Sequence, residues 1–112
     1  MMIKFDYVIE NRTMNPQLAI PQAALRDFCR THAVRELSVF GSAVRDDFGP
    51  DSDVDVLIDL APGARIGLVA LQRMRDELAA LFGRPVDLLT KNGINRHIRD
   101  DILKQAEIIH AD

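Results

Sequence analysis

The chain has 112 residues, which is enough for one compact domain and too few for two. Hydrophobic residues make up 47% of it and charged residues 28%, so a buried core and a solvated surface can both form. A formal net charge of −3 and only 5% aromatic residues argue against a protein that binds nucleic acid through a broad basic face or by stacking bases.

A single cysteine, Cys29, excludes a disulfide scaffold and a thiolate zinc site. Because it falls in a helix-like stretch, we interpret it as a small core residue and not as a reactive nucleophile. No apolar run approaches the ~20 residues of a membrane span, and the charged start of the chain does not resemble a signal peptide. We therefore expect a cytoplasmic protein that makes no contact with a membrane.

Residues 1–15 are interpreted as a poorly defined N-terminal extension, and residues 16–112 as a single domain. Phe5, Tyr7 and Ile9 alternate with polar residues, which hints at a short strand inside the extension. No internal repeat and no low-complexity segment is visible in the chain.

The remainder of the chain alternates helical and extended patterns. A helix is predicted from Pro21 to about His32, because proline suits a first helical turn and the apolar residues recur at helical spacing. A short strand at 37–40 and a short helix over Ala43–Asp47 follow. The clearest strand is Val54–Ile58, which is β-branched and mostly apolar, as expected for a strand covered on both faces.

The second half of the chain continues this alternation. A helix is predicted over 66–82, with a stripe of leucines on one side and Gly83 in the position of a C-terminal cap. A third strand is predicted over Val86–Leu89. Isoleucines at helical spacing then predict a last helix over 94–109, whose exposed apolar end favours a hetero-oligomer. The residues of this exposed apolar end are Ile108 and Ile109.

Strands that alternate with helices predict an α/β (α+β) fold in which helices flank a small mixed β-sheet. Four arginines around the central helix are interpreted as a solvated face, and direct binding of nucleic acid is not expected. These are Arg65, Arg73, Arg75 and Arg84.

Two carboxylates, Asp53 and Asp55, stand two residues apart at the start of the clearest strand. Side chains at i and i+2 of a strand project from one face, about 6–7 Å apart along the backbone. Such a pair suits two hard cations, which prefer oxygen ligands and can clamp the attacking and leaving oxygens of a phosphoryl transfer. Asp87 is the natural third ligand, because a carboxylate within an apolar strand is costly unless it is paired or bound to metal.

Gly41 and Ser42 lie between a strand and a predicted helix, and ten residues separate them from the aspartate pair. A glycine lets the backbone approach a phosphate closely, and a helix N-terminus offers N–H groups and a partial positive charge. Ser42 adds a hydroxyl donor, and Arg45, one turn later, can reach a phosphate oxygen. The pattern predicts a triphosphate cradle that faces a metal site.

Several simpler interpretations explain these residues less well. A calcium loop beginning at Asp51 would need glycine and glutamate where Val56 and Pro62 stand. A merely solvated strand end would not explain the accompanying Gly-Ser pair and Asp87. The three histidines lack the spacing of metal ligands, and the chain has no Walker A loop or Rossmann fingerprint.

Taken together, these motifs resemble the signature of the minimal nucleotidyltransferases of the DNA polymerase β-like superfamily. The resemblance covers about residues 21–110 and implies the polymerase β-like nucleotidyltransferase fold. The motifs that carry it are Phe40-Gly41-Ser42, Arg45, Phe48-Gly49, Ser52-Asp53-Val54-Asp55-Val56-Leu57 and Val86-Asp87-Leu88.

The resemblance also implies a reaction. The chain is expected to be a nucleotidyltransferase that moves AMP from ATP to an acceptor hydroxyl with the help of two Mg²⁺ ions, releasing pyrophosphate. Asp87 would also help to deprotonate the acceptor. The implied metal ligands and catalytic residues are Asp53, Asp55 and Asp87, and the implied nucleotide-binding residues are Gly41, Ser42, Arg45 and Ser52.

Many small members of this family are antitoxins that pair with a helical HEPN-type ribonuclease toxin, and some attach AMP to a toxin tyrosine. The resemblance therefore implies a protein adenylyltransferase with a HEPN-type toxin as its partner. One alternative is a non-catalytic antitoxin that acts by binding the toxin. Another is a nucleotidyltransferase acting on a small molecule or RNA, although such relatives usually carry an extra helical domain.

Overall fold

The computed structural model describes residues 20–44, 49 and 51–111. The predicted strand near Phe5 and the last residues of the helix predicted over Ala43–Asp47 lie outside these residues. The elements, in chain order, are α2 (Gln22–Thr31), β1 (Val34–Phe40), the 3₁₀ turn η1 (Gly41–Val44), β2 (Val54–Leu60), α3 (Leu68–Phe82), β3 (Val86–Thr90), the 3₁₀ turn η2 (Lys91–Gly93), α4 (Arg96–Gln105) and β4 (Glu107–Ala111).

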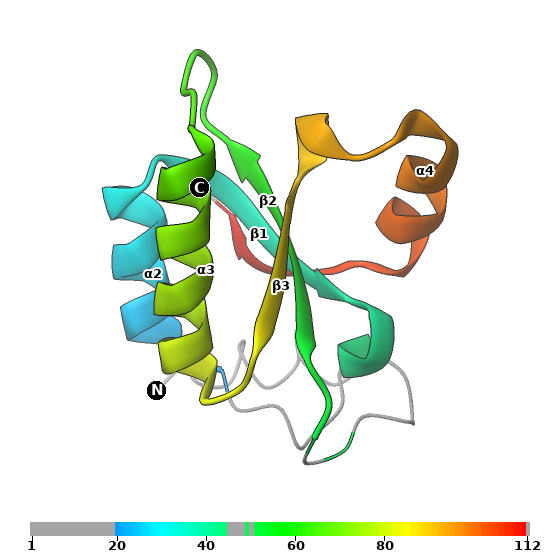
Figure 1. The fold of residues 1–112 in the computed structure, drawn as a ribbon, viewed down its shortest axis with the longest axis horizontal. Helices are drawn as coiled ribbons and strands as arrows, with labels where there is room; N and C mark the ends of the chain where they lie inside the picture. Colours follow the sequence, from blue (N-terminus) through cyan, green and yellow to red (C-terminus); the bar gives the residue numbers. More distant parts are fainter. Residues whose placement is uncertain (1–19, 45–48, 50, 112) are drawn as a thin grey trace.

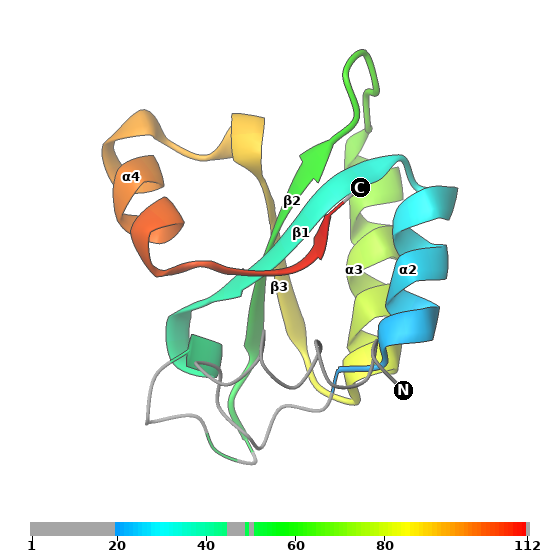
Figure 2. The same cartoon turned by 180° about the vertical axis from the view of Figure 1, so that it is seen from behind.

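The strands form one mixed sheet in the order β3-β2-β1-β4. β1 runs antiparallel to both β2 and β4, whereas β2 and β3 are parallel and are joined through α3. Helices α2 and α3 lie side by side on one face of the sheet, and α4 covers the other face (Figures 1 and 2). The predicted fold class, a small mixed sheet flanked by helices, is therefore confirmed.

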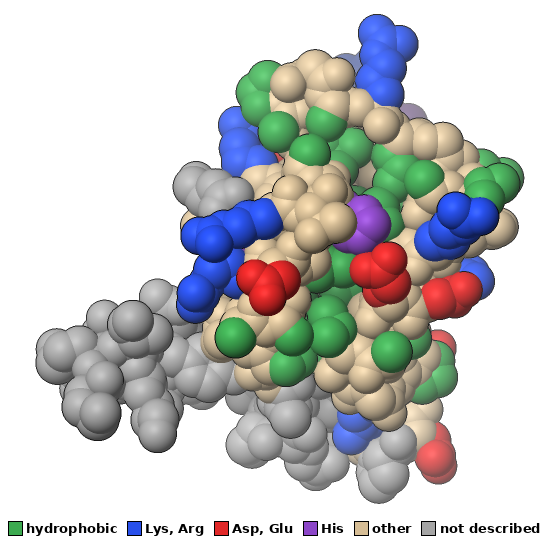
Figure 3. All heavy atoms as spheres, turned by 90° about the vertical axis from the view of Figure 1, so that its left-hand side faces the viewer, with side chains coloured by type: hydrophobic (Ala, Val, Ile, Leu, Met, Phe, Trp, Pro, Cys, Tyr) green, Lys and Arg blue, Asp and Glu red, His purple; other side chains and the backbone are tan. Residues whose placement is uncertain are grey.

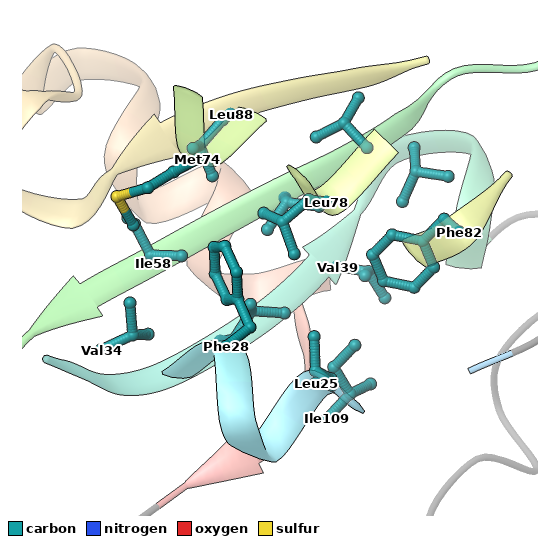
Figure 4. Packing of buried hydrophobic residues seen from close by; sticks show 14 of the residues in the cluster. Leu25, Phe28, Val34, Val39, Ile58, Met74, Leu78, Phe82, Leu88 and Ile109 are labelled. Atoms are coloured by element: carbon teal, nitrogen blue, oxygen red, sulfur yellow. The ribbon is translucent and has the colours of Figure 1, made fainter. Parts of the chain in front are cut away.

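The main core fills the space between the sheet and the helices α2 and α3 (Figure 4). Its side chains point inward from all three elements, and Cys29 of α2 is fully buried among them, as expected for a small core residue. The fully buried large side chains are Leu25, Leu37, Ile58, Met74 and Leu78, with Val34, Val39, Val54 and Val56.

The leucine stripe predicted for helix α3, Leu68, Leu71, Leu78 and Leu81, is confirmed in part, because Leu78 is buried and Leu71 and Leu81 pack partly buried against the core. Met74, Leu78 and Phe82, four residues apart, are buried, whereas Leu68 is 71% exposed. The spacing of four places one side chain per turn against the sheet. Gly83 ends the helix in the left-handed conformation, at φ 68°, and its N–H donates to the carbonyl of Ala79 at 2.8 Å.

The last predicted helix, over 94–109, is wrong in its final residues. Helix α4 begins after Asn95, whose side chain accepts a hydrogen bond from the His97 N–H at 2.8 Å, and it ends at Gln105. Glu107–Ala111 is instead strand β4, paired antiparallel with β1. Isoleucine suits an extended edge position, and the open edge of β1 supplies hydrogen-bond partners that are remote in sequence.

This correction changes the exposed apolar surface inferred for the chain terminus. Ile109 is only 5% exposed and belongs to the main core, while Ile108 remains 50% exposed on β4. Only one of the two residues therefore supports the surface that was expected to favour a hetero-oligomer.

A second, smaller core holds α4 against the sheet. It consists of Phe40 at the end of β1, Leu57 of β2, Ile94 before α4 and Ile102 within it. Because Phe40 directly precedes Gly41, the packing that positions α4 also positions the turn after β1.

An ion pair lies at the end of the sheet where β1 begins and β2 ends. Arg35 donates a hydrogen bond to the Asp59 carboxylate, and Lys91 lies 3.9 Å from the same oxygen. The hydrogen bond, together with the charge of Asp59, raises the pKa of Arg35 above its ordinary value. No helix in the described part of the chain is both long and apolar enough to span a bilayer.

Candidate functional site

Three strands meet at the edge of the sheet where the predicted carboxylates lie. Asp55 pairs with Asp87 in the parallel register of β2 and β3, and it pairs with Phe40 in the antiparallel register of β1 and β2. Directly paired residues project from the same face, so the two aspartates lie on the α4 side of the sheet. Asp53 is exposed and directly precedes β2.

Gly41 is in close contact with the Asp55 side chain. Its φ is +67°, in the left-handed region that favours glycine. A Cβ atom at this position would lie 2.1 Å from Asp55 Oδ2, so any larger residue would collide with the carboxylate. The sequence suggested that this glycine makes room for a phosphate, and the structure adds that it makes room for one of the predicted metal ligands.

The N–H of Gly41 is occupied by a residue that the sequence analysis missed. Gln105, the last residue of α4, accepts a hydrogen bond from it at 3.2 Å through Oε1. The pattern had suggested that the first N–H of the turn is a free donor for phosphate, but Gln105 already accepts its hydrogen bond. No local signal could have revealed this contact, because the two residues are 64 positions apart.

The two serines of the motif hold the chain around the aspartates. Ser42 lies 3.4 Å from the carbonyl of Asp53 and donates a long hydrogen bond to it. Ser52 accepts a hydrogen bond from the Gly49 N–H at 2.9 Å. The Ser42 hydroxyl thus contacts the backbone of Asp53 itself, whereas the Ser52 hydroxyl contacts the turn that precedes Asp53.

The prediction that Arg84 lies on a solvated face is wrong. Arg84 is half-buried after α3, and its guanidinium donates to the carbonyls of Gly49 and Ser52. The other arginines of that set, Arg65, Arg73 and Arg75, are exposed as expected. Arg45, the arginine predicted to meet a phosphate, lies outside the described residues.

The donor set suits a hard divalent cation in chemistry. All candidate ligands are carboxylate oxygens, as Mg²⁺ prefers. Among the described residues, however, no three Asp, Glu, His or Cys side chains stand close enough together to hold an ion. Mg²⁺ in proteins is often held by one or two carboxylates and by the phosphates of a substrate, so the pair Asp53 and Asp55 fits such a site. The three-carboxylate site stays a prediction.

A separate hollow on the helical face does not belong to this site. It is an open, mostly apolar groove between α2 and α3, crossed by a hydrogen bond of 3.1 Å between His32 and Glu77. Figure 3 shows this face, where acidic and basic side chains are scattered among hydrophobic ones. It lies across the sheet from Asp55 and Asp87, so it contributes no group to the carboxylate edge.

The contact between Gln105 and Gly41 gives a first testable prediction. Gln105→Met keeps the length of the side chain but leaves the part-buried N–H of Gly41 without its acceptor, which should lower the free energy of unfolding by roughly 1–3 kcal/mol. Urea denaturation measures this change. Gln72→Met, at an exposed position of α3, is the control and should stay within about 0.5 kcal/mol of the parent. Equal stability of the two variants would contradict the contact.

Comparison with known protein families places this chain in a described family. The model of the nucleotidyltransferase domain matches residues 22–109, which include every described element from α2 to β4 except the last two residues of that strand. A Methanocaldococcus jannaschii protein whose name assigns it protein adenylyltransferase activity is 37% identical over 67% of this chain and 78% of its own length. Protein adenylyltransferase MntA of Thermococcus cleftensis is 38% identical over 64% and 71%.

Solved structures show the same fold. A toxin–antitoxin complex with AMP-PNP contains a chain that superposes with a TM-score of 0.70 at 15% identity, over 83% of this chain and 75% of that one. A structure described as a minimal nucleotidyltransferase gives a TM-score of 0.63 at 29% identity, over 76% and 85%. A complex of a tri-AMPylated Shewanella oneidensis HEPN toxin with its MNT antitoxin gives 0.62 at 15%, over 81% and 70%.

Proposed function

This chain belongs to the nucleotidyltransferase domain family, and from that premise we propose that it transfers AMP from ATP to a hydroxyl group of a partner protein. The proposed partner is a HEPN-type toxin, which the modification or the contact itself would silence. The observation that carries the proposal is the position of Asp55, which is in register with Asp87 and packs against Gly41. The relatives named protein adenylyltransferases support the same reaction.

The reaction is a substitution at the α-phosphorus of ATP. The acceptor hydroxyl oxygen forms a bond to that phosphorus while the bond to the bridging oxygen of the β-phosphate breaks, so pyrophosphate leaves with the electron pair. The hydroxyl that receives AMP loses its proton, and we propose that the exposed carboxylate of Asp87 takes this proton. The product is a phosphodiester between AMP and the partner protein.

The residues at the carboxylate edge have distinct proposed roles. Asp53 and Asp55 would hold Mg²⁺, and when bound the metal would neutralise charge on the phosphates and orient them for in-line displacement. The turn after β1 would hold the triphosphate through Ser42, with Arg45 and Ser52 as further candidates for phosphate contacts. Gly41 would set the backbone conformation of that turn, because its left-handed φ turns the chain beside Asp55.

Intact-mass spectrometry of the partner tests this proposal. The protein encoded by the adjacent gene is incubated with this chain, ATP and Mg²⁺, and we expect a gain of one or more AMP units. Asp53→Ala, at an exposed position before β2, should abolish the gain without disturbing the core. Reactions without ATP, or with EDTA, are the matched controls.

The same experiment separates the remaining interpretations. A stable complex without any mass gain would contradict AMP transfer and favour a non-catalytic antitoxin. If the Asp53→Ala chain still silenced the toxin in cells, catalysis would not be needed for neutralisation. Loss of ATP without modification of the partner would point to a small-molecule or RNA acceptor.

A further inference from the structure

We propose that Arg84 is a positioning residue that holds the chain segment before β2 and thereby places Asp53 and Asp55. The inference deepens the proposed function and rests on it, because it concerns the same carboxylates. The effect of Arg84 would pass through the backbone that it binds.

The contacts of Arg84 converge on one turn. Its Nη1 atom donates to the Gly49 carbonyl at 2.6 Å and lies 3.3 Å from the Ser52 carbonyl. The turn is closed from within, since the Ser52 N–H donates to the Gly49 carbonyl at 3.1 Å and the Gly49 N–H donates to the Ser52 hydroxyl at 2.9 Å. The half-buried guanidinium thus donates hydrogen bonds to two carbonyls of a turn whose last residue, Ser52, directly precedes Asp53.

The position of Arg84 in the chain makes this contact a link between the two acidic strands. Arg84 follows the glycine that caps α3 and stands two residues before β3, the strand that carries Asp87. Its neighbour Pro85 accepts a hydrogen bond from the Val54 N–H at 2.9 Å, which fixes the first residue of β2. The two hydrogen bonds of the Arg84 side chain and one backbone hydrogen bond therefore join the segment before β2 to the segment before β3.

A positively charged donor is well suited to this task. Hydrogen bonds from a charged donor are stronger than neutral ones, so Arg84 can hold both carbonyls more firmly than a neutral donor would. Two adjacent carboxylates repel each other when no cation is bound, so the backbone that carries them needs support from elsewhere. We expect Arg84 to supply that support.

Three variants separate this role from a general effect on stability. Arg84→Met keeps an aliphatic stem but removes the donors. Arg84→Lys keeps a single charged nitrogen, and because both contacts are made by one nitrogen, Nη1, lysine should restore them in part. Arg73→Met, on the exposed face of α3, removes a similar charge from a position remote from the turn.

The first readout is hydrogen exchange of backbone amides in the whole chain without nucleotide. We expect the Ser52 and Val54 amides to exchange at least about tenfold faster in Arg84→Met, with partial recovery in Arg84→Lys. Amides within the core part of β2, such as that of Ile58, should exchange as in the parent. Equal acceleration throughout the sheet would show a merely structural role and overturn the proposal.

The second readout is binding of Mn²⁺, a paramagnetic probe, in the presence of a non-hydrolysable ATP analogue. The dissociation constant should rise about tenfold in Arg84→Met, recover in part in Arg84→Lys and stay unchanged in Arg73→Met. Unchanged exchange at Ser52 together with unchanged Mn²⁺ affinity would refute the role of Arg84, even if the parent transfers AMP. Absence of AMP transfer by the parent would instead overturn the proposed function. The exchange data would still show whether Arg84 holds the turn at Gly49 and Ser52.

Discussion

Asp55→Asn is expected to lower the rate of AMP transfer by roughly 10³-fold or more. The amide keeps the shape of the side chain beside Gly41 but removes the negative charge that would hold the cation. A bound metal contributes several kcal/mol of transition-state charge stabilisation, and each 1.36 kcal/mol corresponds to about a tenfold change in rate.

The rate is measured as AMP units gained by the partner per unit time at saturating ATP. Asp59→Asn is the matched control, because it neutralises a carboxylate on the same strand, at the far end of β2. Asp59 pairs with Arg35, so this control should lose some stability but keep its transfer rate. A rate for Asp55→Asn within tenfold of the parent would remove Asp55 from the metal site.

Gly41→Ala is expected to abolish transfer and to destabilise the fold as well. The left-handed backbone conformation costs an L-residue roughly 1–2 kcal/mol. The added Cβ would also stand 2.1 Å from Asp55 Oδ2, so either the turn or the carboxylate must move. Since the carboxylate is a proposed metal ligand, its displacement should reduce activity far more than the loss of stability alone explains.

Gly63→Ala separates these two causes. Gly63 has φ +82°, also in the left-handed region, but a Cβ there would meet no atom within 4 Å. Its variant should show the backbone cost in urea denaturation and full transfer activity. The double variant Gly41→Ala/Asp55→Ala should recover part of the stability lost by Gly41→Ala, because the collision is gone, but none of the activity. If the two single glycine variants lost equal stability, the contact with Asp55 would be refuted.

Local sequence patterns predicted most of the secondary structure. The helix after Pro21 and the cap at Gly83 follow from helical spacing and from residues with restricted or permissive backbones, which act over a few positions. The pattern was wrong for residues 107–109, which belong to β4 and where isoleucines fit a helix and a strand about equally well. The open edge of β1 decided between them, and no local window contains that information.

The site divides in the same way. The sequence by itself determined which residues are candidates for the chemistry: Gly41, Asp53, Asp55 and Asp87 are predicted because their types and spacing suit phosphates and hard cations. Only the tertiary structure decided which groups position them. Gln105 reaches Gly41 from 64 positions away, and Arg84 reaches Gly49 from 35 positions away. The physical reason is that chemical identity belongs to each residue, whereas a positioning contact exists only after the chain has brought distant segments within hydrogen-bond reach.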